Sequence, residues 1–158
     1  SHQVDQFLFF TNSTRGEVVT SQVANYRHQE HPGFQDFGEF MLRGNGGTGY
    51  VRLDWFTPKG LGVWGDTRLI VEGTEGYLEV RKNIDIGGRD GPEHLFLVDG
   101  DGIEHLDCRD MELPYGPRIV DDVVHRTETA MTQEHCFLAT DLALQAQQQA
   151  TWLEGAPA

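Results

Sequence analysis

The strongest constraint on the fold is a β-hairpin signal near the middle of the chain. Residues 67–72 and 77–82 are rich in β-branched and apolar residues, and a Gly-Thr-Glu-Gly sequence at 73–76 separates them. The segment therefore predicts two antiparallel strands joined by a turn. A chain built around such a hairpin must bury at least one face of a β-sheet.

Two more hairpins are predicted from the same kind of signal. Residues 36–43 and 48–57 flank a Gly-Asn-Gly-Gly sequence, and Asn-Gly between alternating segments is a strong hairpin signal. Residues 94–98 and 103–108 flank an Asp-Gly-Asp-Gly sequence. A further strand is predicted over 17–27 from its β-branched residues. Residues 3–11 include the closely spaced Phe7, Leu8, Phe9 and Phe10, and the periodicity of this segment fits either a helix or a strand.

Helices are predicted toward the C-terminus. The first covers 118–129, with an apolar stripe made of Ile119, Val120, Val123 and Val124. The second follows Thr132, whose hydroxyl can accept a hydrogen bond from the first free amides. Its apolar positions at helical spacing are Cys136, Ala139, Ala143, Ala146, Ala150 and Leu153. Gly155 and Pro157 are expected to close it.

Strands followed by helices indicate an α+β fold. We expect an open, mostly antiparallel sheet with helices packed on one face, which leaves the other face free for oligomerisation. The length of 158 residues fits a single domain over 1–158. Because the chain does not begin with Met, we also expect it to be part of a longer protein.

Charge and cysteine content narrow the class of protein. The net charge of −13 argues against a nucleic-acid partner and against an anionic membrane surface. No apolar run approaches membrane-spanning length, and the N-terminus has no secretion signal. Cys108 and Cys136 are the only two cysteines, which is too few for a disulfide framework. A cytoplasmic location is therefore the expectation.

The predicted strand over 48–57 has an unusual second face. Side chains alternate along a strand, so Val51, Leu53 and Trp55 point one way, whereas Tyr50, Arg52, Asp54 and Phe56 point the other. The second set could contact the hydroxyls and ring face of a polyol. It could equally form a subunit interface, where aromatics and Arg are enriched, and we favour the interface.

His2 and Asp5 are the candidate catalytic residues. If the N-terminal segment is helical, they lie three residues apart on one face, where a carboxylate can orient an imidazole and influence its protonation. The alternative is that they form an ordinary helix surface, an N-terminal cap or a remnant of an expression vector.

Other polar clusters favour structural interpretations. His28 and His31 could contribute to a zinc site with Cys108 or Cys136, but the spacing is not a strong metal motif, and surface histidines or an active-site rim fit better. Asp99-Gly100-Asp101-Gly102 is typical of a turn rather than of a calcium loop. Cys136, next to His135, could be catalytic only as an activated thiolate, and its helical position favours a core role.

Three motifs occur in the order found in one enzyme family. They are Asp54-Trp55-Phe56-Thr57-Pro58, Trp64-Gly65-Asp66, and Gly73-Thr74-Glu75-Gly76 with the following segment to Gly88. In these motifs the chain resembles the C-terminal domain of the Gfo/Idh/MocA oxidoreductases, and the resemblance extends from His2 to about Gln147. It implies a reaction that transfers a hydride between NAD or NADP and a sugar, polyol or related hydroxy compound.

The resemblance also implies roles for His2 and Asp5. Many members carry an Asp-x-x-x-His-x-x-Asp motif, and the last part of it matches these two residues. The matching His acts in proton transfer together with a Lys of the nucleotide-binding domain, whereas Asp5 could be a structural partner. A homodimer or homotetramer formed through the sheet is also implied.

The chain departs from the family pattern in one major respect. It contains no strand-linked Gly-x-Gly-x-x-Gly sequence, and the glycine clusters at 44–49 and 87–91 lie between predicted strands rather than before a helix. The N-terminal Rossmann domain is therefore expected outside this chain, which alone should neither bind the dinucleotide tightly nor turn over. The competing interpretation is a non-catalytic assembly or small-ligand-binding module.

Overall fold

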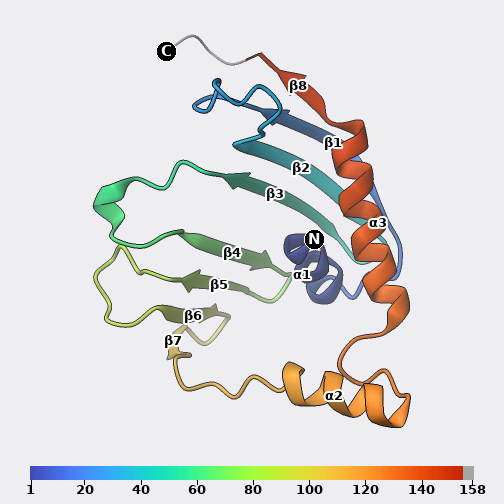
Figure 1. The fold of residues 1–158 in the computed structure, drawn as a ribbon. Helices are drawn as coiled ribbons and strands as arrows, with labels where there is room; N and C mark the ends of the chain where they lie inside the picture. The colour runs from blue at the N-terminus through green and yellow to red at the C-terminus, as the bar shows by residue number, and fades with distance from the viewer. Residues whose placement is uncertain (155–158) are drawn as a thin grey trace. The chain divides into compact units, whose positions relative to one another are not determined.

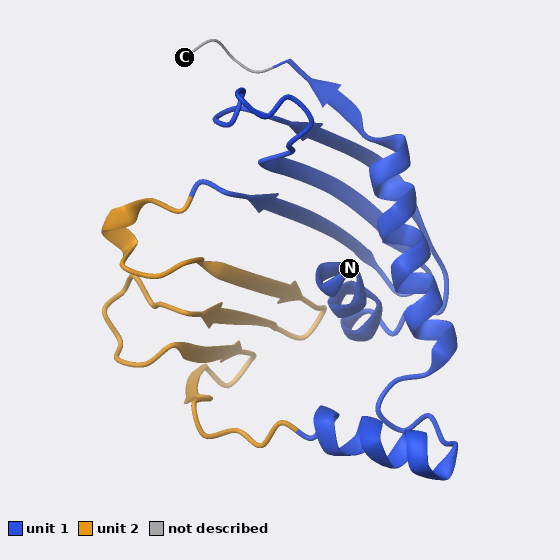
Figure 2. Cartoon of the chain, in the orientation of Figure 1, with its two compact units in different colours: residues 1–56, 114–158 blue, residues 57–113 orange. Residues whose placement is uncertain are grey.

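The computed structural model describes residues 1–154, which fall into two compact units (Figure 2). Unit 1 contains Ser1–Phe56 and the segment from Pro114 onward, and unit 2 contains Thr57–Leu113. Each unit has its own four-stranded sheet.

Unit 1 packs two helices on one face of a curved sheet (Figure 1). Its sheet has the order β3-β2-β1-β8, in which β1, β2 and β3 are antiparallel and β8 runs parallel to β1. The elements of unit 1 are α1 (His2–Phe10), β1 (Gly16–Ala24), β2 (Phe37–Gly44), β3 (Thr48–Asp54), α2 (Tyr115–His125), α3 (Gln133–Gln149) and β8 (Thr151–Leu153).

The core of unit 1 lies between α1, α3 and the sheet. Its buried members are Val4, Phe7, Leu8, Leu42, Ala139 and Leu142. Gly49 of β3 allows α1 to approach closely, because a Cβ at this position would lie 2.7 Å from Cδ2 of Phe7. The core therefore fixes the position of α1, which carries His2 and Asp5.

Unit 2 is an antiparallel meander with the strand order β4-β5-β6-β7. A short 3₁₀ helix, η1 (Lys59–Leu61), precedes β4 (Thr67–Glu72), β5 (Tyr77–Lys82), β6 (Glu93–Val98) and β7 (Ile103–Asp107). The predicted Gly-Thr-Glu-Gly turn joins β4 to β5, and the Gly73 N–H donates to the Gly76 carbonyl at 2.8 Å.

The α+β class and the three predicted hairpins are confirmed. The antiparallel strands are shared between two sheets, and the ambiguous segment at 3–11 is a helix. The helix expected at 118–129 lies at 115–125, and its apolar stripe is exposed. Among the described residues, no helix has the length and apolar character needed to cross a membrane.

The end of the last helix differs from the prediction. Ala150 has an extended backbone, with φ −62° and ψ 126°, so α3 ends at Gln149. Residues 151–153 pair with β1 instead, because their backbone hydrogen bonds extend the sheet. Ala150 and Leu153 are therefore not on the helix, and Cys136 is exposed rather than in the core. Gly155 and Pro157 lie outside the described residues.

Candidate functional site

The first turn of α1 carries both predicted catalytic residues. His2 and Asp5 occur three residues apart in this helix, as expected, and His2 is exposed. The partner of Asp5 is a residue that the sequence did not connect to it. Its Oδ1 accepts a hydrogen bond from Nε2 of His135, at 2.6 Å. The two residues are 130 positions apart, and no local sequence pattern could have predicted this pair.

His135 is placed by the start of α3. Thr132 caps this helix as predicted, and its Oγ1 accepts the His135 backbone N–H at 3.2 Å. Because α1 and α3 share a core, the imidazole of His135 lies against the carboxylate of Asp5. A carboxylate that is hydrogen-bonded to an imidazole can stabilise a proton on that ring. This hydrogen bond ties the first turn of α1 to the start of α3.

A second carboxylate–imidazole pair lies in the loop between β1 and β2. Asp36 is fully buried and accepts backbone N–H groups of Tyr26 and Arg27 at 2.8 and 2.7 Å. Its Oδ2 also lies 2.9 Å from Nδ1 of His28. Burial raises the pKa of this carboxyl, but the hydrogen bonds from Tyr26, His28 and Arg27 outweigh burial and hold the pKa below its usual value.

The two histidines of this loop have different environments. His28 is paired with the buried Asp36, whereas His31 is exposed and its Nε2 lies 4.0 Å from the exposed Glu30. The proposed zinc set of His28, His31 and a cysteine is not brought together. No group of three or more His, Cys, Asp or Glu residues able to hold a metal occurs within residues 1–154.

The open face of the unit 1 sheet carries a polar network. Glu39 of β2 accepts hydrogen bonds from the amide of Gln22 and from the hydroxyl of Tyr50. The Tyr50 hydrogen bond lowers the pKa of Glu39 and, reciprocally, raises the pKa of Tyr50. Arg52 bonds Asp54 at 3.1 Å, and its guanidinium lies 5.0 Å from the centre of the Phe37 ring.

This face combines satisfied polar groups with exposed apolar side chains. Tyr50 and Met41 are 59% and 43% exposed. Tyr50, Arg52 and Asp54 share the face, as the alternation predicted, because each lies two residues from the next along β3. The carboxylate of Glu39 already has two donors, so the network offers few free groups to a polyol.

The sheet of unit 2 has a charged cluster of its own. Asp85 is buried and bonds both Arg81 and Arg89, at 2.6 and 3.1 Å. The backbone N–H of Gly87 and the Arg81 guanidinium hold the pKa of Asp85 well below its usual range. Both guanidinium groups lie about 5 Å from the centre of the Phe96 ring, at 5.0 and 4.9 Å. Asp85 thus organises the loop that follows β5.

A histidine pair links the last two strands of unit 2. His94 is buried, and its Nδ1 lies 2.9 Å from Nε2 of His105. Its Nε2 lies 3.0 Å from the carbonyl oxygen of Gly91, an oxygen that can only accept. The neutral His94 ring therefore carries its proton on Nε2. The 87–91 loop is braced by this bond and by Asp85, which gives it a structural role.

The glycine-rich segments do not form a phosphate-binding loop. Gly44 to Gly49 turn the β2–β3 hairpin, and Gly87 to Gly91 connect β5 to β6, so neither precedes a helix. Asp99 Oδ1 accepts the backbone N–H groups of Asp101 and Gly102, which identifies a turn.

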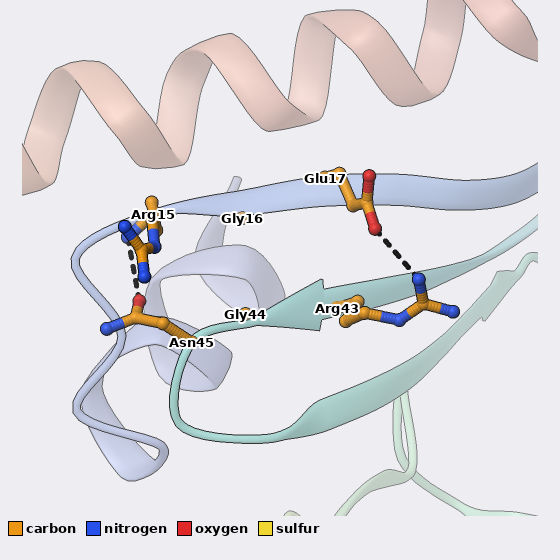
Figure 3. A pocket seen from close by; sticks show the side chains of 6 residues that line it. All are labelled: Arg15, Gly16, Glu17, Arg43, Gly44 and Asn45. Carbon is orange, nitrogen blue, oxygen red and sulfur yellow. Dashed lines mark hydrogen bonds and ion pairs between the residues drawn. The ribbon is translucent and has the colours of Figure 1, made fainter.

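A shallow hollow of about 300 Å³ lies at the hairpin end of the unit 1 sheet (Figure 3). It is lined by Arg15, Gly16, Glu17, Arg43, Gly44 and Asn45. Arg43 pairs with Glu17 at 3.0 Å, and Asn45 Oδ1 accepts the backbone N–H of Arg15 at 3.1 Å. These contacts hold the strand ends together, and the exposed ion pair makes the hollow a weak candidate for a binding site.

Solved structures provide the comparison with known proteins. The crystal structure of a "putative oxidoreductase" from Erwinia carotovora atroseptica SCRI1043 has a TM-score of 0.93 and 48% identity, over 97% of this chain and 46% of that chain. A "putative oxidoreductase" from Thermotoga maritima has a TM-score of 0.77 and 19% identity, over 94% of this chain and 42% of that chain. The second likeness shows the fold alone.

The chain spans less than half the length of either of these proteins. No protein-family model matches it, and no curated protein matches it. The sequence predicted the fold of an oxidoreductase domain, and the solved structures agree with that fold. The chain has an oxidoreductase-related fold.

Proposed function

We propose that this chain is the C-terminal domain of an NAD(P)-dependent oxidoreductase of the Gfo/Idh/MocA type. The observation that carries the proposal is the match to an oxidoreductase structure at 48% identity, of which this chain covers only 46%. The remainder of a similarly built protein would provide the nucleotide-binding domain. His2 and Asp5, which match part of the family motif in sequence, lie in the first turn of α1.

His2 is the proton-transfer residue in this proposal. The reaction is the oxidation of a carbinol carbon of a sugar, polyol or similar hydroxy compound, or its reversal. The hydroxyl proton must pass to a base with a pKa near the working pH, and imidazole fits this requirement. Asp5 supports the site through its hydrogen bond to His135, which ties the first turn of α1 to α3.

The open face of the unit 1 sheet pairs subunits in this proposal. Its exposed apolar residues and its internally satisfied polar network support a dimer or tetramer contact. The same features would also fit a non-catalytic assembly module, which is the second candidate. The two functions differ in whether a longer protein that contains this chain turns over.

The test uses the longer natural protein that contains this chain. Its purified form should bind NAD or NADP and change nicotinamide absorbance at 340 nm with at least one sugar or polyol, whereas the 158-residue chain should do neither. A longer protein with no nucleotide-binding domain would refute the enzymatic proposal and leave the assembly module.

A further inference from the structure

Helix α2 keeps its apolar side chains on its surface. Four branched residues recur at helical spacing along it and are 39–66% exposed, and we call this set the α2 stripe: Ile119, Val120, Val123 and Val124. The only buried residue of α2 is the aspartate Asp122. The helix therefore has the apolar face of an amphipathic helix but does not bury that face within unit 1.

The composition of α2 does not favour a helix that stands alone. Valine and isoleucine lose side-chain freedom in a helix, and the first turn also contains Gly116, a poor helix former. A helix of 11 residues is marginal in water even with favourable residues, so most of its stability has to come from packing of its apolar face. We therefore expect another surface to cover the α2 stripe in the native protein.

A hollow of about 300 Å³ borders the α2 stripe. It lies between α2 and the start of α3, and the apolar part of its wall consists of Ile119, Val123 and Met131. Arg126 also lines this hollow, and among residues 1–154 its guanidinium has no hydrogen-bond or ion-pair partner. An apolar wall beside a free donor fits a protein surface that offers an aliphatic side chain and an oxygen acceptor.

The connection from α2 to α3 holds this surface in a fixed shape. Arg126 has a left-handed backbone, with φ 58° and ψ 43°, which is uncommon for a residue other than Gly, Asn or Asp. The buried Asp122 organises the turn, because its carboxylate accepts the backbone N–H groups of Thr129 and Ala130, both at 2.8 Å. It also accepts the hydroxyls of Thr127 and Thr129 at 2.7 and 2.9 Å. A surface that is already ordered loses little conformational entropy when it binds.

The size of this surface indicates which partner covers it. A stable interface between separate proteins buries about 800 Å² on each partner, which takes roughly 20–30 residues on each side. The α2 stripe and its hollow involve far fewer residues, so they would hold a second copy of this chain only weakly. A domain of the same polypeptide needs less contact, because the covalent connection gives it a high effective concentration. This chain covers 46% of the Erwinia oxidoreductase, so more than half of that protein lies outside the matched part.

We propose that the α2 stripe and its hollow form the docking site for the nucleotide-binding domain of the longer protein. An aliphatic side chain of that domain fills the hollow, and one of its carbonyl or carboxylate oxygens accepts a hydrogen bond from Arg126. Gly116 continues the stripe, and a Cβ added there would meet nothing within 4 Å, so its backbone is open to close approach. The proposal rests on the proposed function, because that function supplies the second domain.

Amide hydrogen exchange of residues 115–125 tests the docking site. We expect these amides to exchange at least about tenfold more slowly in the longer protein than in the 158-residue chain, because docking suppresses the local opening of α2. The shorter chain should show the fast rate at every protein concentration.

Two matched variants of α2 separate docking from helix stability. Val123→Glu places a charge in the stripe and should abolish the slow exchange in the longer protein. Glu has a higher helix propensity than Val, so a weaker helix could not explain this loss. Arg118→Glu introduces the same side chain on the opposite face of α2 and should keep the slow exchange.

A third variant tests the polar contact. Arg126→Gly removes the guanidinium but suits the left-handed backbone, so the variant should fold about as stably as the unchanged chain. In the longer protein it should speed the exchange of α2 about fivefold, because one hydrogen bond to the partner domain is lost.

Three results would overturn the docking site. They are equal exchange of α2 in the two proteins, slow exchange in the shorter chain that appears only as its concentration rises, and equal effects of Val123→Glu and Arg118→Glu. The second of these would assign the stripe to a second copy of the chain. Failure of the proposed function has a different signature, since the longer protein would then neither bind nor turn over a dinucleotide. Dinucleotide turnover with fast exchange of α2 would overturn the docking site alone.

Discussion

Asp36 shows how much a single buried carboxylate can determine. It bonds Tyr26, Arg27 and His28 from a position with no exposed surface. The Asp36→Asn side chain has the same shape, but its NH₂ group replaces a carboxylate oxygen. An NH₂ group donates, so it cannot accept the hydrogen bonds that this oxygen accepted. We expect a loss of about 2 kcal/mol in the free energy of unfolding, measured by urea denaturation. Asp101→Asn, at an exposed turn residue, is the control and should cost far less. An Asp36→Asn protein as stable as the original would refute the assigned hydrogen bonds.

Acid should destabilise the protein through three buried carboxylates. The pKa values of Asp36, Asp85 and Asp122 all lie below the usual aspartate value, because backbone N–H groups and polar side chains donate hydrogen bonds to the charged forms. A carboxylate whose pKa is lower in the folded state than in the unfolded state stabilises the folded protein at pH values above its unfolded pKa of about 3.9. This stabilisation is lost as the pH falls toward the pKa of the folded state. The melting temperature should therefore fall steeply below about pH 4, and a flat profile there would contradict these shifts.

At the scale of elements, the close approach of α1 to β3 depends on Gly49. A Cβ there would lie 2.7 Å from the ring of Phe7, which is itself in the core. Gly49→Ala should cost about 1–3 kcal/mol, because either the ring or the helix must move. Gly33→Ala is the matched control, since nothing lies within 4 Å of its added Cβ. Thermal melting of both variants checks this prediction, which fails if they unfold at the same temperature.

The packing of α3 gives a second comparison. Leu142 is fully buried against α1 and the sheet, whereas Leu144 on the same helix is 56% exposed. Leu142→Ala should destabilise unit 1 by about 2–5 kcal/mol, and Leu144→Ala by much less. The denaturation midpoints of the two variants test this packing. If α3 were instead rotated so that Leu144 faced the core, Leu144→Ala would destabilise the protein more than Leu142→Ala.

Individual helices, strands and turns could be predicted from the sequence more easily than the contacts between them. The Gly-Thr-Glu-Gly turn, the alternation in β3 and the Thr132 cap are local signals, and the structure contains all three. The division into two sheets depends on which strands pair, and the pairing of Asp5 with His135 depends on how α1 packs on α3. Such contacts join distant parts of the chain, and one sequence carries no local signal for them.

For the whole molecule, self-association should depend on the open face of the unit 1 sheet. Met41 is 43% exposed on this face, so Met41→Glu should place a charge in the proposed contact and shift the protein toward monomer in sedimentation equilibrium. Ile103→Glu in unit 2, at a residue 78% exposed, should leave the association state unchanged. A monomeric unaltered protein, or equal behaviour of both variants, would count against this interface.

The central claim is that His2 transfers the substrate proton in an oxidoreductase that contains this chain. The most direct measurement is kcat of the longer protein and of its His2→Ala variant, with His31→Ala as the control. We predict a fall of roughly 10²–10⁴-fold for His2→Ala with little change in dinucleotide affinity, and near-normal turnover for His31→Ala. Unchanged turnover in the His2→Ala protein would contradict the role assigned to the first turn of α1.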